Sequence, residues 1–281
     1  MALAAGAASA AEHPPDGGIP DVTSARDLAL SSGVAIATGN EGIYLNAGAL
    51  AARKRYSLDV PVLWDRRGAD TTGLFFGSSV VDSQSSPVTA GFSFLREQKG
   101  LYAGDLFHVA LAGTPMEKLH LGATGKYYTL HGPTSTNIGT VDAGLLWEVA
   151  QWVTLGAAGY NLVPVANDAV APLSASAGLA IGSDESFQVT GEWRGQFDRD
   201  GKTYNRYGGG AELLLGDAMA SARFPIRAGF QKDDRLGSDW WSAGLGVVTR
   251  GGVAVDAGYR QATHDSSART IAVGLRLFLF Q

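Results

Sequence analysis

The sequence predicts an all-β protein: a transmembrane antiparallel β-barrel of about 14 strands with an N-terminal luminal plug segment. Three observations predict it. Apolar residues recur at every second position in successive segments, the connections between segments alternate in length, and aromatic residues lie near segment ends. Successive side chains of a strand point to opposite faces, so a period of two indicates strands with one apolar face.

The alternation is clearest in residues 140–162, where Val141, Leu145 and Trp147 share one face and Asp142 lies on the other. Fourteen segments of this kind follow one another from Lys54 onward, and most have the length of a tilted strand that crosses a bilayer. They are Lys54–Asp65, Thr71–Val81, Pro87–Arg96, Leu106–Gly113, Lys118–Leu130, Thr140–Val149, Gln151–Leu162, Leu173–Gly182, Ser186–Phe197, Thr203–Leu215, Ser221–Gln231, Asp239–Thr249, Gly252–Thr263 and Arg269–Phe280.

The connections favour a membrane barrel over the alternative, a soluble β-sandwich. Those after even-numbered segments are brief, such as "AQ" and "RG", whereas those after odd-numbered segments include "HGPTSTNIG" and "VPVANDAVAP". Short periplasmic turns and longer outer loops are typical of bacterial outer-membrane barrels. The apolar face also persists through every segment, and the opposite face is charged, as in a barrel with a wet lumen.

Aromatic side chains near strand ends suit the headgroup region of a bilayer, because one end of each ring is apolar and the other polar. The residues predicted for this membrane interface are Tyr56, Trp64, Trp147, Trp152, Trp240 and Trp241. They predict the bacterial outer membrane as the location and outer-membrane lipid as a partner.

Composition excludes several classes of protein. There is no cysteine, charged residues make up 17%, and the formal charge is −5 with no basic patch, so no nucleic-acid partner is expected. The sequence contains no run of 18 or more apolar residues, so no transmembrane helix is predicted. Residues 1–11 are interpreted as a signal-peptide remnant or a disordered Ala-rich tail, residues 12–52 as the periplasmic or luminal plug segment, and residues 53–281 as the barrel.

The plug prediction comes from residues 23–52, which show no long alternation and contain glycines that break a long helix. This region resembles the FadL-like and PorV/PorQ-like outer-membrane barrels, which often begin "SARALALGGA…VA…D…A.YWNPAGLA". The matching positions here are Ser24, Ala25, Arg26, Leu28, Ala29, Leu30, Val34, Ala35, Tyr44, Asn46, Leu50 and Ala51. Thr140–Leu162 is also similar to the family's "FDLGALYRP..WLTLGLSLRNL".

The resemblance implies a fourteen-stranded barrel with an N-terminal luminal segment, and it makes Asn46 the counterpart of the family's Asn-Pro-Ala plug element. Tyr44, Gly48 and Leu50 are expected to belong to the same plug. The sequence departs from the pattern at Ala47, where proline is usual, and at residues 31–32, where serines replace paired glycines.

Charged residues on the inward phase of the later strands predict a luminal charge ladder. Its members are Glu192, Arg194, Arg206, Glu212, Arg223, Arg227, Asp256 and Arg260. Because acids and bases are interleaved, the set either stiffens the wall through ion pairs or steers anions through the lumen.

No catalytic, cofactor or metal site is expected. The five histidines have no metal-ligand spacing, and neither a GxSxG motif nor a phosphate-binding loop is present. Two functions remain. The first is a non-enzymatic scaffold or anchor of a cell-envelope assembly, with other envelope proteins as partners, which the scarcity of long outer loops favours. The second is a plugged channel for small hydrophobic or anionic solutes.

Overall fold

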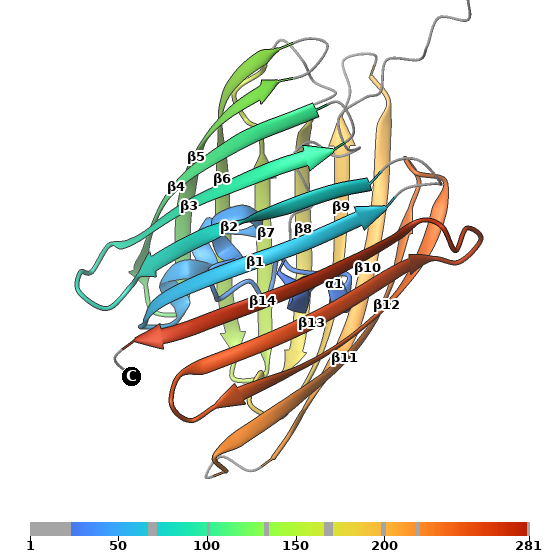
Figure 1. The fold of residues 1–281 in the computed structure, drawn as a ribbon. Coiled ribbons are helices and arrows are strands. Elements are labelled where there is room, and N and C mark those ends of the chain that lie inside the picture. Colours follow the sequence, from blue (N-terminus) through green and yellow to red (C-terminus); the bar gives the residue numbers. More distant parts are fainter. Residues whose placement is uncertain are drawn as a thin grey trace, which may run out of the picture.

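The computed structural model describes residues 24–66, 72–99, 102–131, 135–165, 171–197, 201–216 and 220–279. In this part of the chain, fourteen antiparallel strands form one closed barrel (Figure 1). Each strand pairs with its neighbours in sequence, and β1 (Tyr56–Arg66) pairs with β14 (Arg269–Leu279) along their whole lengths. The predicted fold class is confirmed.

The strands lie close to the predicted segments. The others are β2 (Thr72–Asp82), β3 (Thr89–Lys99), β4 (Tyr102–Met116), β5 (Leu119–His131), β6 (Thr136–Ala150), β7 (Val153–Tyr160), β8 (Leu173–Gly182), β9 (Phe187–Phe197), β10 (Thr203–Leu215), β11 (Ala222–Asp233), β12 (Ser238–Thr249) and β13 (Val253–Ala262).

The largest boundary differences concern β4 and β6, which begin at Tyr102 and Thr136 rather than at Leu106 and Thr140. Their backbone ladders to β3 and β5 continue beyond the residues whose side chains alternate between apolar and polar. Backbone hydrogen bonds do not depend on the side chain, so a pattern of side chains misses these extensions.

The two faces of the sheet have the predicted character. Every strand presents at least one large apolar side chain outward, and Leu245, which is 64% exposed, is the extreme example. Their inward neighbours are polar in many strands, for example Asp142 beside Val141. The outer surface is therefore an apolar band that suits lipid.

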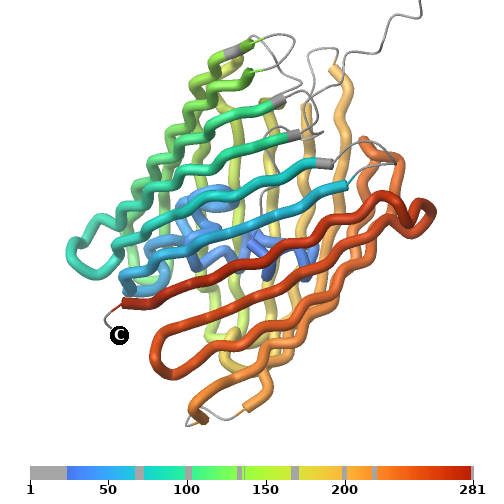
Figure 2. The backbone as a smooth tube through the Cα atoms, viewed as in Figure 1, coloured from blue at the N-terminus to red at the C-terminus, as the bar shows by residue number. Residues whose placement is uncertain are grey.

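One end of the barrel carries the brief turns together with the start of β1 and the end of β14 (Figure 2). We call it the periplasmic end, because short turns mark that side in outer-membrane barrels. The opposite, extracellular end carries the connection between β7 and β8. Among the described residues, no helix is long and apolar enough to cross a membrane.

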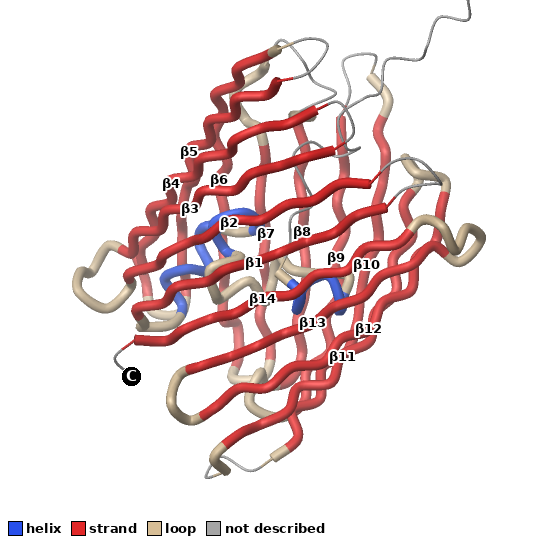
Figure 3. Tube along the Cα trace, viewed as in Figure 1, coloured by secondary structure: helices blue, strands red, loops and turns tan. Residues whose placement is uncertain are grey.

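Residues 24–52 lie inside the barrel and form the plug (Figure 3). They fold into α1 (Ala25–Leu30), α2 (Gly42–Leu45) and the 3-10 helix η1 (Ala47–Ala52). α1 contacts β10 to β14, whereas η1 contacts β3 to β6. The luminal plug is thus observed for residues 24–52, and the predictions for residues 1–11 and 12–23 fall outside the described residues.

Local sequence explains why α1 is short. Ser24 caps its first turn: its hydroxyl accepts the backbone N–H of Asp27 at 3.2 Å and donates to the carboxyl of Asp27 at 2.7 Å. Ser31 ends the helix in the left-handed region, with φ of 52°.

Candidate functional site

Inward-facing glycines on β5 to β8 and β10 to β13 form the part of the barrel wall that contacts the plug. A Cβ atom at any of them would lie less than 3.0 Å from a plug atom. At Gly229, for example, it would lie 2.7 Å from the carbonyl oxygen of Ala29. The nine glycines are Gly122, Gly144, Gly156, Gly178, Gly208, Gly210, Gly229, Gly244 and Gly258. Part of the unusual glycine content, 38 residues, therefore serves close approach between plug and wall.

Asn46 fastens the plug to the barrel wall. Its amide nitrogen donates to the carbonyl of Val34 at 2.7 Å and to that of Leu145, on β6, at 2.8 Å. Its amide oxygen accepts the backbone N–H of Gly48 and so caps η1. A Cβ at Gly48 would meet two wall carbonyl oxygens at 2.8 Å, which explains the glycine. Proline after Asn46 is not needed for this arrangement.

The other two predicted plug residues pack against the early strands. The hydroxyl of Tyr44 hydrogen-bonds that of Ser93 on β3, and its ring meets that of His108 edge-on, with centroids 5.0 Å apart. Leu50 is 1% exposed and belongs to an apolar cluster that includes Val81 of β2. All four predicted plug residues therefore contact the wall or order the plug.

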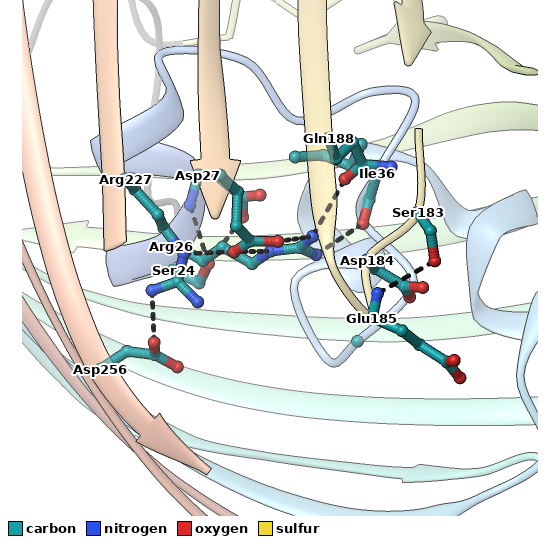
Figure 4. Close-up of polar contacts among 12 residues, drawn as sticks. Ser24, Arg26, Asp27, Ile36, Ser183, Asp184, Glu185, Gln188, Arg227 and Asp256 are labelled. Carbon is teal, nitrogen blue, oxygen red and sulfur yellow. Dashed lines mark hydrogen bonds and ion pairs between the residues drawn. The ribbon is translucent and has the colours of Figure 1, made fainter. Parts of the chain in front are cut away.

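Arg26 of α1 is the centre of a buried polar network (Figure 4). Its guanidinium pairs with Glu212 of β10 at 2.8 Å and donates to Gln188 at 3.3 Å and to the carbonyl of Ile36 at 3.2 Å. Burial alone would lower the pKa of Arg26, but the attraction and hydrogen bond of Glu212, together with attraction by Glu41 and Asp27, outweigh it and raise the pKa. Arg26 was noticed in the sequence only as part of the resemblance, because its partner lies 186 positions away.

The network extends along the later strands. Arg227 of β11 pairs with Glu212 and also with Asp256 of β13. A second link joins Glu41 of the plug to Arg276 of β14 at 2.7 Å. Three predicted ladder residues, Glu212, Arg227 and Asp256, therefore meet in space, and they hold the plug as well as the wall.

The remaining ladder residues are placed differently. Glu192 accepts the backbone N–H groups of Gly33 and Val34 at 2.7 and 2.9 Å, so it too holds the plug. Arg194 and Arg206 are cross-strand neighbours. The guanidinium of Arg194 lies over the ring of Tyr160, 4.3 Å from its centroid. Arg206 lines a small cavity beside Asp27.

Two arginines complete the set. Arg260 lies over the ring of Trp240 and donates to Gln231 at 3.3 Å. Arg223 lines the large cavity at the periplasmic end, and its guanidinium forms no ion pair within the described part of the chain.

The interface prediction is wrong for Trp240. This side chain is 3% exposed and points into the lumen, whereas its neighbour Trp241 is 40% exposed on the outer face. Adjacent residues of a strand face opposite sides, so the pair cannot share the lipid face. Trp147 and Trp152 are 46% and 54% exposed. Tyr56 and Trp64 are partly exposed on the outward phase of β1.

Asp27 gives the plug a predicted pH dependence. Burial, followed by repulsion from Glu41, raises the pKa of Asp27 from 3.8 to about 8. The folded plug therefore favours the protonated carboxyl, and this stabilisation is complete below pH 3.8 and is lost as pH rises to about 8. Melting temperatures measured between pH 5 and 9.5 should fall for the wild type and stay level for Asp27→Asn. Identical slopes for both proteins would contradict this assignment.

The extracellular half of the lumen has an apolar wall on β1 to β6, which the sequence analysis did not single out. Its inward side chains form a cross-strand row, in which Leu63 pairs with Phe75 and Leu106 with both Leu95 and Tyr128. They are nearly fully buried and pack on one another and on Val165 of the β7–β8 connection. The residues are Leu63, Phe75, Leu95, Leu106, Tyr128, Leu130 and Ile138. We call this cluster the outer apolar wall.

The opposite side of the same half is polar. Its inward residues on β9, β10, β11 and β13 are Arg194, Gln196, Arg206, Gln231, Asp233 and Arg260. Below the plug, at the periplasmic end, lie two cavities of about 680 and 170 Å³. Both are lined by Arg26 and Thr38 of the plug. The outer part of the lumen therefore has one apolar and one polar side, and the plug separates it from the cavities at the periplasmic end.

Comparisons with known proteins find matches among solved structures. No protein-family model and no curated protein matches the sequence. The Ralstonia pickettii toluene transporter TbuX matches with a TM-score of 0.67 and 11% identity, over 92% of this chain and 98% of that one. The CymD monoaromatic hydrocarbon channel matches with a TM-score of 0.66 and 13% identity, over 92% of this chain and 98% of that one. A Pseudomonas aeruginosa FadL homologue matches with a TM-score of 0.59 and 9% identity, over 91% of this chain and 97% of that one.

At these identities the likeness shows the fold. The FadL-like resemblance is confirmed at that level, whereas the PorV/PorQ-like part of it stays a prediction. The closed fourteen-stranded barrel with its apolar outer band agrees with this result. The chain is an outer-membrane β-barrel with the FadL-type fold.

Proposed function

We propose that the protein is a passive, plugged channel for small apolar solutes. The observation that supports it best is the outer apolar wall. General porins have a polar, water-filled lumen, whereas here six strands turn leucine, isoleucine and aromatic side chains inward. An apolar solute that buries about 150 Å² there gains about 4 kcal/mol, whereas a sugar or an ion would lose hydration.

The comparisons support the channel better than the scaffold favoured by the sequence. Two of the matching structures are a monoaromatic hydrocarbon channel and a toluene transporter, and those activities belong to those proteins. Because the fold is shared, we propose a non-enzymatic channel role for this chain as well. The scaffold role stays a prediction, and co-purification of an envelope protein with the barrel would support it.

Leu106 offers a test, because its side chain is fully buried in the outer apolar wall. Gram-negative cells with intact lipopolysaccharide, which express the protein, should take up labelled toluene faster than cells without it. Leu106→Gln should lower this increment several-fold, because it places an unpaired amide in the outer apolar wall. Leu106→Met, which conserves volume and polarity, should retain it. Equal uptake by all three proteins at matched surface levels would overturn the proposal.

A further inference from the structure

The larger periplasmic cavity, about 680 Å³, has the features of a binding site. It lies between residues 38–41 of the plug and the inner face of β10 to β14. Five consecutive strands give it an apolar strip, formed by Leu214, Pro225, Val248, Ala254 and Phe278. Its lining contains seven basic and five acidic side chains, so the local charge is positive in a chain whose overall charge is −5.

Most of these charges are already paired. Arg26 and Arg227 meet Glu212, and Arg276 meets Glu41. The guanidinium groups of Arg55 and Arg223, in contrast, form no ion pair with any described residue. The cavity thus presents two arginines that form no ion pair with a described acid; Lys54 is a third such cation, and its ammonium donates to the carbonyl of Ser86 at 3.4 Å.

Of these two arginines, Arg55 is held in the more defined position for binding an anion. Its backbone is held by Ser83, whose hydroxyl accepts the N–H of Arg55 at 2.8 Å and whose backbone N–H donates to the carbonyl of Arg55 at 2.9 Å. Its guanidinium lies over the ring of Phe278, 5.8 Å from the centroid. Burial and the nearby Arg276 lower the pKa of Arg55 to about 10, which a bound anion would reverse.

The stacking also defines the shape of a ligand. A guanidinium that lies on an aromatic ring keeps its N–H edge available for a carboxylate, which it can bind through two parallel hydrogen bonds. A flat apolar group attached to that carboxylate would then rest beside Phe278 and along the apolar strip.

We propose that this cavity binds a small organic monoanion with a flat apolar body, such as an aromatic carboxylate. The anionic group pairs with Arg55, and Arg223 contributes only long-range attraction. This inference goes beyond the proposed passage of apolar solutes and does not depend on it, because the cavity lies on the periplasmic side of the plug.

Isothermal titration calorimetry of the detergent-solubilised full chain with benzoate tests the proposed binding site. The measurement does not depend on transport through the barrel. Benzoate should bind, and benzyl alcohol, its neutral analogue, should bind at least tenfold more weakly. Arg55→Ala should weaken benzoate binding at least tenfold, and Arg55→Lys should recover part of the loss. Arg250→Ala, which removes an exposed charge from the β12–β13 turn at the same end, should change nothing.

Two further variants test the roles assigned to Arg223 and Phe278. Arg223→Ala should weaken binding about two- to threefold, and the effect should disappear at high salt. Phe278→Leu should weaken benzoate but leave hexanoate unchanged. Absence of benzoate binding, equal binding of benzyl alcohol, or an unchanged affinity in Arg55→Ala would overturn the proposal. Tighter binding of hexanoate than benzoate would overturn the flat shape assigned to the ligand.

Discussion

Glu212→Gln is expected to release the plug and raise the ion conductance of the barrel. The carboxylate of Glu212 lies between Arg26 of the plug and Arg227 of the wall. Its removal leaves the buried Arg26 without its ion-pair partner and leaves Arg227 with Asp256 as its one remaining partner among the described residues. Breaking a buried ion pair by removing one partner costs about 3–5 kcal/mol. Planar-bilayer recordings should show larger and more frequent openings than those of the wild type.

Two controls separate charge imbalance from general damage. The double variant Arg26→Met/Glu212→Met removes both charges and leaves the pair between Arg227 and Asp256, so it should conduct less than Glu212→Gln. Glu148→Gln breaks the pair with Arg53, whose side chain is 44% exposed, and should cost less than about 1 kcal/mol. Wild-type conductance in Glu212→Gln would show that this network does not hold the plug.

Leu245→Arg is expected to destabilise the barrel by about 2–4 kcal/mol, because this side chain lies near the middle of the lipid-facing surface. Leu245 is 64% exposed on β12. Val248→Arg is the matched control. Val248 lies on the same strand, but its side chain lines the periplasmic cavity, where an added guanidinium stays hydrated.

Folding titrations in urea with lipid vesicles would measure both costs. The cost of Val248→Arg should be about 1 kcal/mol or less. Equal costs for the two variants would contradict the assignment of the inner and outer faces of β12.

The strand framework could be predicted because its cause is local. A barrel strand needs apolar residues on one face, and this need appears directly as a period of two, as in β8 and β10, whose bounds agree with the prediction. The plug could be located because the alternation is missing from residues 23–52. The same period could also have assigned Trp240 to the lumen, since Trp241 occupies the outward phase.

The contacts inside the lumen could not be predicted in this way. Arg26 and Glu212, or Asn46 and Leu145, are far apart in sequence, and only closure of the barrel brings them together. The outer apolar wall is equally non-local. Leu63, Leu95 and Leu106 each occupy a single inward position on a different strand. On β1 and β3 the leucine is an isolated large apolar residue among polar or small inward neighbours.

The selectivity of the wild-type channel is the most direct test of this account. In one population of lipopolysaccharide-intact cells, the initial uptake rates of labelled toluene and arabinose would be measured together, with cells that carry a general porin as reference. The outer apolar wall and the plug predict a toluene-to-arabinose ratio at least tenfold above that reference. A ratio equal to or below that of the porin would contradict the account.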